Sequence, residues 1–325
     1  MQAIRQHEFG PPDVLLAEDV PDLHPGPDQV RVAVEAAGVH LVDTAIRRGE
    51  PGPFPPPELP MTPGREVAGL VDELGPGLDP AWLGARVVAH LGPVSGGYAS
   101  QAVVPVSALR PVPDGLDAAA AVALIGTGRT AVAVLEHAAL APDDVVVITA
   151  AAGGLGTLFV QAARHRGATV VGLAGGPDKV ARVAALGADV AVDYDRPGWV
   201  DEVRRQVSAT PTLVLDGVGS DRGRGAFELL GPGGRIVLFG WSSGTVTPFT
   251  SADLAERGLS ASWSIGPAMM KRWGSLEPLE RRALADGAAG VWSPVVTRFP
   301  LADAADAHRA LEARATVGKA VLVAG

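Results

Sequence analysis

Cysteine is absent from the 325-residue sequence, and its absence excludes whole classes of chemistry. Without cysteine there are no disulfides, thiolate nucleophiles, cysteine-ligated zinc sites or iron–sulfur clusters. The composition also fits a reducing compartment, where disulfides are rare. Tyrosine occurs only at Tyr98 and Tyr194, and lysine only at Lys179, Lys271 and Lys319. No Ser-Tyr-Lys catalytic constellation can therefore be recognised.

Positive charge is scarce as well. Lysine and arginine number 27 against 36 aspartates and glutamates, so the formal net charge is −9. This balance argues against duplex DNA or an anionic membrane as a partner, because both are bound mainly through basic side chains. The first residues lack the apolar run of a signal peptide, and the most apolar stretch, 118–125, is too short to span a bilayer. We expect a cytoplasmic protein with no nucleic-acid or membrane partner.

The first third of the chain is rich in turns. Short alternating apolar runs, such as 30–34, are separated by proline and glycine, which predicts a β-rich region. The segment Glu50–Pro63 has too many prolines for a regular element. We interpret it as a surface loop, either beside a cleft or as a plain connector. A helix is expected at 117–140, with Asp117 as its N-cap.

From Val145 onward, strands alternate with helices. This alternation is typical of right-handed βαβ units around a parallel sheet and predicts an α/β fold. Strands are expected at 145–149, 169–173, 190–192, 213–215 and 235–239, helices at 155–166, 178–186, 199–207 and 223–230, and a final strand, helix and strand at 291–299, 302–313 and 320–323.

The most specific local signal is the segment Val145–Gly156, where an apolar strand runs into a turn of small residues and then a helix. This order is the context of a dinucleotide-binding fingerprint, although an ordinary tight strand–helix turn is the alternative interpretation. Gly153 would let the backbone approach the pyrophosphate, and Gly156 would let the helix pack closely. The helix N-terminus would present free N–H groups to the phosphates. The residues predicted to bind the pyrophosphate are Ala151, which replaces the usual first glycine, Ala152, Gly153, Gly154, Leu155 and Gly156.

The end of the second strand indicates which nicotinamide cofactor binds. NAD sites place an acidic residue there, whereas a 2′-phosphate favours a cation. The strand 169–173 runs into Gly175 with no carboxylate at its tip, and Lys179 follows. Asp178 lies in the first helical turn, where the helix dipole explains an acidic residue. A solvated helix face is the alternative interpretation of Lys179, but the pattern favours NADPH.

Several spaced motifs together carry a resemblance to one enzyme family. They are Ala36-Ala37-Gly38-Val39, Asp43-Thr44, Gly64-x-Glu66-x-Ala68-Gly69, Asp216-x-Val218-Gly219 and Ala307-His308-x-Ala310-Leu311-Glu312-x-Arg314. In this order the sequence resembles the medium-chain dehydrogenase/reductase superfamily, specifically its zinc-free quinone oxidoreductase (zeta-crystallin-like) branch. The resemblance implies a GroES-like β-rich catalytic domain, 1–120 and 266–325, around a Rossmann NADPH-binding domain, 121–265.

The resemblance also implies residue roles. The predicted catalytic residues are His40, Asp43, Arg65 and Thr130, around which the acceptor is expected to bind. The predicted cofactor-binding residues outside the fingerprint are Lys179, Tyr194 and Arg314 at the 2′-phosphate, Thr130, Phe239 and Gly240 near the nicotinamide, and Thr127 and Gly175, which complete the set.

The sequence departs from its relatives at several of these positions. Zinc-dependent members of the superfamily hold a catalytic metal through a Cys, a His and a third Cys or Asp, which correspond to His40, Arg65 and Thr127. Because arginine is a permanent cation and threonine offers only a hydroxyl, no metal site is predicted. Within the quinone reductase branch, His40 stands where asparagine is usual and Ala45 where tyrosine is common.

An acceptor reduced without a metal should stabilise the added hydride by itself. Quinones do so by becoming aromatic, and α,β-unsaturated carbonyls do so as enolates. Catalysis then depends on holding the reactants together and on donors to the developing oxyanion. His40 could be such a donor, or a structural replacement for asparagine. We expect NADPH-dependent quinone reduction; the alternatives are reduction of an enone, alkenal or enoyl thioester by NADPH, and a non-catalytic NADPH-binding protein with a structural or regulatory role.

Two further expectations concern assembly and acceptor size. The segment 259–265 is expected to be an edge strand of the Rossmann sheet, and its pairing across a two-fold axis would form a homodimer, as in relatives. Ala45 lacks the bulk of tyrosine, so larger quinones or bulky enones should fit better than benzoquinone.

Overall fold

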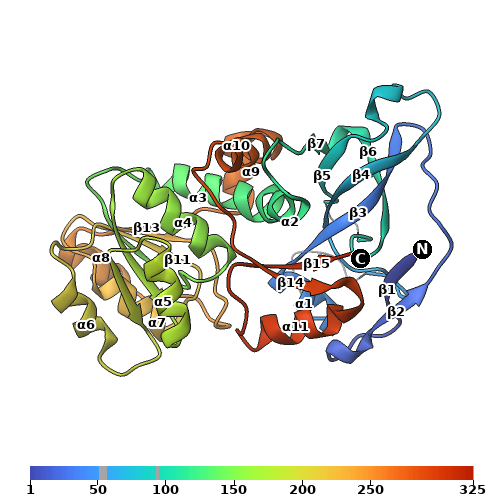
Figure 1. Ribbon diagram of the computed structural model, residues 1–325. Coiled ribbons are helices and arrows are strands. Elements are labelled where there is room, and N and C mark those ends of the chain that lie inside the picture. Colours follow the sequence, from blue (N-terminus) through green and yellow to red (C-terminus); the bar gives the residue numbers. More distant parts are fainter. Residues whose placement is uncertain (51–56, 93–94, 325) are drawn as a thin grey trace. The chain divides into compact units, whose positions relative to one another are not determined.

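The computed structural model describes residues 1–50, 57–92 and 95–324 (Figure 1). The chain forms two compact units, Met1–Thr127 with Pro294–Gly325, and Gly128–Ser293. Each unit contains its own cluster of buried apolar side chains. Residues 51–56 of the proline-rich loop Glu50–Pro63 lie outside the described residues, so the predicted place of that part beside a cleft stays a prediction.

The first unit is built on a seven-stranded sheet in the order β14-β15-β3-β4-β5-β7, with β6 paired to β3 and a separate β1-β2 pair. In β3 the alternating Val30, Val32 and Val34 are buried, as the period-2 pattern predicts. The C-terminal β15 pairs antiparallel with β3 and parallel with β14, so both chain ends build this unit. Its strands are β1 (Gln2–Gln6), β2 (Leu15–Asp19), β3 (Gln29–Val39), β4 (Glu66–Leu74), β5 (Arg86–His90), β6 (Gln101–Pro105), β7 (Leu109–Pro111), β14 (Val296–Pro300) and β15 (Lys319–Val323).

Helices of the first unit pack on this sheet and its edges. α2 contacts β3 and β4, and α11 contacts α1, β14 and β15. These helices are α1 (Leu41–Arg48), α2 (Ala118–Ala123) and α11 (Ala304–Glu312), and the short 3-10 turns are η1 (Pro12–Val14), η2 (Pro80–Trp82), η3 (Val106–Ala108) and η5 (Leu301–Asp303).

The second unit is a parallel six-stranded sheet in the order β10-β9-β8-β11-β12-β13, with helices between the strands (Figure 1). The strand order reverses between β8 and β11, which is where doubly wound folds bind dinucleotides. This topology confirms the predicted Rossmann α/β class. Its strands are β8 (Val145–Ile148), β9 (Thr169–Ala174), β10 (Val190–Asp193), β11 (Leu213–Asp216), β12 (Arg235–Leu238) and β13 (Ser260–Trp263), and its helices are α3 (Arg129–Ala138), α4 (Gly154–His165), α5 (Pro177–Ala185), α6 (Trp199–Gln206), α7 (Ser220–Glu228), α8 (Ser251–Arg257), α9 (Pro267–Trp273) and α10 (Glu277–Ala288).

The helix expected at 117–140 consists of α2, a π-helical segment, η4 (Leu124–Gly128), and α3. Asp117 caps it as predicted, because its carboxylate accepts from the backbone N–H of Ala120 at 2.7 Å. Ala118–Ala138 is long and apolar enough to cross a membrane by length and composition, but 78% of its most apolar part is buried inside the protein. Such burial is typical of the core helix of a folded domain.

Both boundaries of the second unit, Gly128–Ser293, fall later in the chain than the expected limits of 121–265. The first falls after Thr127, because α2 packs on the sheet of the first unit. The second falls after Ser293, although the alternation of strands and helices fades after residue 262. The reason is that α10 packs on α3, and the indole N–H of Trp292 donates to the carbonyl oxygen of Leu158 at 3.0 Å.

Candidate active site and cofactor site

The fingerprint forms the turn between β8 and α4. Ala150 adopts a left-handed φ of 47°, and α4 begins directly after Gly153. Gly156 is required sterically, because a Cβ there would lie 2.2 Å from the carbonyl oxygen of Ala150. The first N–H groups of a helix have no intrahelical acceptor and favour anions, so this turn fits a pyrophosphate. Of the six predicted residues, Ala151, Ala152 and Gly156 are buried, and Gly153, Gly154 and Leu155 are partly exposed.

A second cluster forms where β9 and β10 end. Gly175 follows β9, and a Cβ there would lie 2.4 Å from a carboxylate oxygen of Asp195. The guanidinium of Arg222 lies 5.0 Å from the centre of the Tyr194 ring. Lys179 lies in the first turn of α5, the helix that follows β9. Gly175, Lys179 and Tyr194 thus belong to adjacent strand ends of one sheet, and Arg222 is a cation that sequence reasoning missed.

This cluster also contains two carboxylates that the sequence did not indicate, because they lie at the end of β10 rather than of β9. Asp193 accepts from the backbone N–H groups of Gly176 and Asp195, both at 3.0 Å. Asp195 pairs with Arg222. Asp193 is thus held by backbone N–H groups, and Asp195 offsets the charge of Arg222 within the second unit.

The ends of β11 and β12 are held together by small residues. A Cβ on Gly217 would lie 2.3 Å from the ring of Phe239, and one on Gly240 would lie 3.1 Å from the carbonyl oxygen of Gly217. The buried Asp216 accepts from Thr149 at 2.7 Å and from the backbone N–H of Val218 at 2.9 Å. The Asp216-x-Val218-Gly219 motif is therefore a loop-organising element that places Phe239 and Gly240 beside β11.

The remaining cofactor candidates belong to helical segments. Thr127 lies in η4, and Thr130 lies in the first turn of α3; both are partly exposed. Arg314 follows α11 in the first unit and adopts a left-handed φ of 56°.

In the first unit, three charged or polar side chains meet at one edge of the sheet. His40 directly follows β3, Glu66 begins β4, and Lys319 begins β15. They come together because β3 pairs with both of the other strands. Nε2 of His40 lies 2.8 Å from Oε1 of Glu66 and 2.9 Å from Nζ of Lys319, and Nζ lies 2.9 Å from Oε2 of Glu66.

Glu66 is the charged centre of this group and is fully buried. Burial raises the pKa of its carboxyl, but the interactions with His40 and Lys319 outweigh burial and hold that pKa well below its usual range. Glycine is required on both sides: a Cβ on Gly38 or on Gly126 would lie 2.0 Å or 1.7 Å from a carboxylate oxygen. Sequence reasoning quoted Glu66 in a motif and counted Lys319 among three lysines, yet it assigned neither a role.

Asp43 holds His40 from the opposite side. Its Oδ2 accepts from the backbone N–H of His40 at 2.8 Å and from the hydroxyl of Tyr98 at 3.1 Å. Nε2 of His308 lies 3.1 Å from the same hydroxyl, and Arg47 lies 3.3 Å from Nδ1 of His308. Because arginine only donates, His308 must donate from Nε2 to Tyr98, which donates to Asp43. Asp43, predicted as catalytic, is thus the buried end of a hydrogen-bond chain that fixes the start of α1.

The electrostatics of this chain follow from its burial. Burial, with the charges of Arg47 and Arg48, lowers the pKa of His308 to about 3. Burial, with the neighbouring Asp43 carboxylate, raises the pKa of Tyr98 well above its usual range. At neutral pH both side chains are therefore uncharged and act only as hydrogen-bond relays.

Arg65 and Ala45 complete the predicted acceptor residues. Arg65 is 7% exposed and immediately precedes Glu66, and Ala45 lies partly exposed on α1. Within the described ranges, no group of three His, Cys, Asp or Glu side chains could hold a metal ion.

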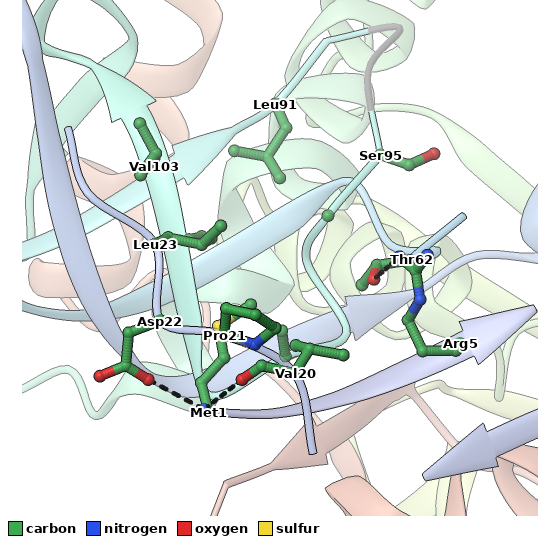
Figure 2. A pocket seen from close by; sticks show the side chains of 13 residues that line it. Met1, Arg5, Val20, Pro21, Asp22, Leu23, Thr62, Leu91, Ser95 and Val103 are labelled. Atoms are coloured by element: carbon green, nitrogen blue, oxygen red, sulfur yellow. Dashed lines mark hydrogen bonds and ion pairs between the residues drawn. The ribbon is translucent and has the colours of Figure 1, made fainter. Parts of the chain in front are cut away.

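A separate cavity of about 570 Å³ opens in the first unit beside β1 and β6 (Figure 2). Arg5 donates to the hydroxyl of Thr62 at 3.1 Å, and the ammonium of Met1 pairs with Asp22 at 2.9 Å. The rest of its wall is largely apolar and includes Leu23, Leu91 and Val103 (Figure 2). The predicted site residues are not among the described residues that line it, so it is not assigned to the reaction.

Two family models match the chain: the alcohol dehydrogenase GroES-like domain over residues 26–114, and the zinc-binding dehydrogenase over residues 154–279. A 2-haloacrylate reductase from a Burkholderia species is 34% identical over 326 residues, covering 98% of this chain and 97% of the relative. A quinone oxidoreductase from Salmonella typhimurium is 30% identical over 328 residues, covering 98% of each.

Solved structures agree with these matches. An NAD-dependent alcohol dehydrogenase superposes with a TM-score of 0.87 at 33% identity and covers 100% of both chains. The Escherichia coli quinone oxidoreductase in complex with NADPH superposes with a TM-score of 0.85 at 29% identity, covering 99% of this chain and 100% of the other.

The β-rich unit and the Rossmann unit with its phosphate turn define a nicotinamide-dependent dehydrogenase or reductase. The chain belongs to the medium-chain dehydrogenase/reductase superfamily, in its quinone oxidoreductase branch. The resemblance and the fold class predicted from the sequence are thereby confirmed. The protein is an oxidoreductase enzyme rather than the non-catalytic binding protein that the sequence left open.

Proposed function

We propose that the protein transfers a hydride from NADPH to a quinone without a catalytic metal. The observation that carries the proposal is the end-to-end match to quinone oxidoreductases, one of which was solved in complex with NADPH. The positions that correspond to zinc ligands in relatives carry His40, Arg65 and Thr127, of which only the histidine is a good metal ligand.

The cofactor would be held by two groups of residues. The turn that ends at Gly156 receives the pyrophosphate at the N-terminus of α4. The resemblance assigns the 2′-phosphate to Lys179, Tyr194 and Arg314, and Arg222, which pairs with Asp195, lies beside the Tyr194 ring. When bound, NADPH supplies the hydride. Thr130, Phe239 and Gly240, with Thr127 and Gly175, complete the proposed site.

The acceptor is bound by the residues at the start of α1 and β4. His40 donates a hydrogen bond and then a proton to the acceptor oxygen, and Asp43 holds the backbone of His40 in place. Arg65 supplies fixed positive charge for the developing oxyanion. One hydride and one proton convert a quinone to a hydroquinone, so the electrons and protons balance.

A panel of acceptors tests the proposal. We expect NADPH oxidation with naphthoquinone or phenanthrenequinone, and a kcat about 10²-fold lower for His40→Ala, because a general acid contributes about that much. His40→Asn, which restores the residue usual in this branch, should lose less. His24→Ala is a matched control, because the side chain of His24 is 74% exposed. Absence of turnover with every quinone in the panel would exclude the proposal.

The second candidate function is the reduction of an activated carbon–carbon double bond. It is favoured by one observation: the 2-haloacrylate reductase is more similar to this chain than the Salmonella quinone oxidoreductase, at 34% against 30% identity. The same panel should include 2-chloroacrylate, an enone and an enoyl thioester. Turnover confined to these acceptors would replace the quinone proposal with this one.

We also propose that the protein is a cytoplasmic homodimer. β13 ends the strand order of the second unit's sheet, so its outer edge can pair with a second copy across a two-fold axis. Light scattering at micromolar concentration should give twice the chain mass of 33.1 kDa. A mass of one chain would contradict the dimer.

A further inference from the structure

The imidazole of His40 faces two groups of opposite charge through a single ring nitrogen. Nε2 approaches Oε1 of Glu66 at 2.8 Å and Nζ of Lys319 at 2.9 Å. A neutral imidazole carries its proton either on Nε2 or on Nδ1, so one tautomer can bond to only one of these neighbours through Nε2. The neighbour that bonds to Nε2 therefore decides whether Nδ1 can donate a proton to a ligand.

The two contacts differ in alignment. Lys319 meets Nε2 with hydrogen-bond geometry, whereas the carboxylate oxygens of Glu66 reach their neighbours at ion-pair distances without hydrogen-bond alignment. An ammonium group has three donors and no lone pair. The Lys319 contact is therefore a hydrogen bond only when Nε2 accepts, which places the proton of a neutral ring on Nδ1. A proton on Nε2 would point an N–H group of His40 at an N–H group of Lys319, with the two nitrogens only 2.9 Å apart.

Glu66 is the charge partner of the buried Lys319. The side chain of Lys319 is 6% exposed, and a charge so deeply buried needs a partner of opposite sign. The carboxylate of Glu66 supplies this partner, because its Oε2 lies 2.9 Å from Nζ of Lys319. Backbone register fixes the contact, since Ala320 lies opposite Val39, one residue before His40.

We propose that Lys319 is a positioning residue that selects the Nδ1–H tautomer of His40, so that the ring presents a donor to the acceptor oxygen. The inference rests on the proposed function of His40. Without the ammonium, the ring proton would lie on Nε2 and bond to Glu66. Nδ1 would then present a lone pair, rather than a donor, to the developing oxyanion. The start of α1 fixes the backbone of His40, and the Lys319–Glu66 pair fixes its protonation.

The same contact supplies the proton balance of the reaction. When the Nδ1–H bond breaks and the O–H bond of the product forms, Nε2 takes a proton from Nζ of Lys319. The ring therefore stays neutral, and the lysine is left as an amine beside Glu66 until solvent water returns the proton. No further reductant or oxidant is needed beyond NADPH and the quinone.

The first test needs no substitution at Lys319. In protein labelled with ¹⁵N at histidine, the ring nitrogens of His40 are assigned by comparison with His40→Asn. The proposal expects a protonated Nδ1 and an unprotonated Nε2 at neutral pH. A proton on Nε2, with or without one on Nδ1, would overturn it.

The second test uses Lys319→Met, Lys319→Arg and the control Lys271→Met, which removes an exposed lysine of α9. Lys319→Met should move the proton to Nε2 and lower kcat by about 10²-fold with little change in KM, and Lys319→Arg should restore most of kcat. An unchanged tautomer and kcat in folded Lys319→Met would overturn the proposal. If this variant does not fold, the wild-type spectrum decides.

The two proposals fail in different ways. An Nδ1–H spectrum without quinone turnover would leave the tautomer assignment standing and exclude the quinone reductase. Quinone turnover with Nε2–H would exclude the role of Lys319 and leave the reductase standing.

Discussion

Glu66 has two nearly buried cations as neighbours: Arg65 precedes it in the chain, and Lys319 contacts its carboxylate. Arg65 is 7% exposed and Lys319 is 5% exposed. A catalytic zinc ion acts partly as a positive charge that stabilises a developing oxyanion. Preorganised side-chain charges in a buried site can do the same without reorganisation. On the proposed function, a fixed cation in place of a metal ligand would alter which acceptors can react without requiring a different fold.

At the residue scale, the proposed cofactor site makes the choice of cofactor depend on Lys179. Because its ammonium would face the 2′-phosphate, NADPH should bind at least about tenfold more tightly than NADH, or about 1.4 kcal/mol. Lys179→Ala should weaken NADPH and leave NADH unchanged. Fluorescence titration with both cofactors measures this, with Lys271→Ala as a charge-matched control. Equal dissociation constants in the parent protein would contradict the assignment.

Acceptor size depends on Ala45. The small side chain leaves room on α1 that a tyrosine would fill, so kcat/KM should be higher for phenanthrenequinone than for benzoquinone. Ala45→Tyr should shrink or reverse this ratio, because the added volume penalises the larger acceptor first. Ala45→Ser is the matched control, since it adds polarity with little volume. An unchanged ratio in Ala45→Tyr would place the acceptor elsewhere.

At the scale of elements, the chain from Arg47 through His308 and Tyr98 to Asp43 joins α11 to α1. The pKa of His308 is lowered from 6.5 to about 3, so the unfolded chain binds a proton that the folded chain does not. Stability must therefore fall as the pH falls from 6.5 toward 3, by at most about 1.4 kcal/mol per pH unit from this group.

His308→Gln tests this linkage, because an amide keeps one donor and one acceptor without titrating. Urea unfolding between about pH 7 and pH 4 should show a shallower loss of stability in the variant than in the parent. His24→Gln, at an exposed histidine, should leave the slope unchanged. Parallel curves for the parent and His308→Gln would contradict a neutral buried His308.

The sequence predicted elements well where the pattern is local. In the second unit the predicted strands and helices between β8 and β12 agree with the structure to within one residue at each end, apart from α7. That helix begins at Ser220 rather than 223, since the loop held by Asp216 sets its start. The C-terminal boundary of the second unit could not be predicted, because the packing of α10 on α3 leaves no local pattern in the sequence.

The residues of the candidate site also fall into those that a local motif can indicate and those that only the tertiary fold brings together. His40 and Asp43 are neighbours in the chain, and a motif can indicate both. Glu66 and Lys319 meet His40 only through the pairing of β3 with β4 and β15, and the contact between His40 and Lys319 spans 279 positions. Arg222 reaches Tyr194 from a different βα unit. Pairings of this range are set by the tertiary fold and have no counterpart in sequence spacing.

At the scale of the whole molecule, the account assigns the cofactor mainly to the second unit and the acceptor mainly to the first. In the proposed site the turn before α4 receives the pyrophosphate, and side-chain cations take the place of a metal at the acceptor. The claim that joins these assignments is metal-independent hydride transfer from NADPH to a quinone, and activity should survive prolonged chelation.

The most direct test is the rate of NADPH oxidation with a naphthoquinone, measured on protein dialysed against EDTA and phenanthroline, with NADH as the comparison. The account predicts that dialysis leaves kcat/KM unchanged, that NADPH is preferred by at least about tenfold, and that the purified protein contains no stoichiometric zinc. Loss of activity on chelation with recovery on adding zinc, or no quinone-dependent oxidation of NADPH before or after dialysis, would contradict it.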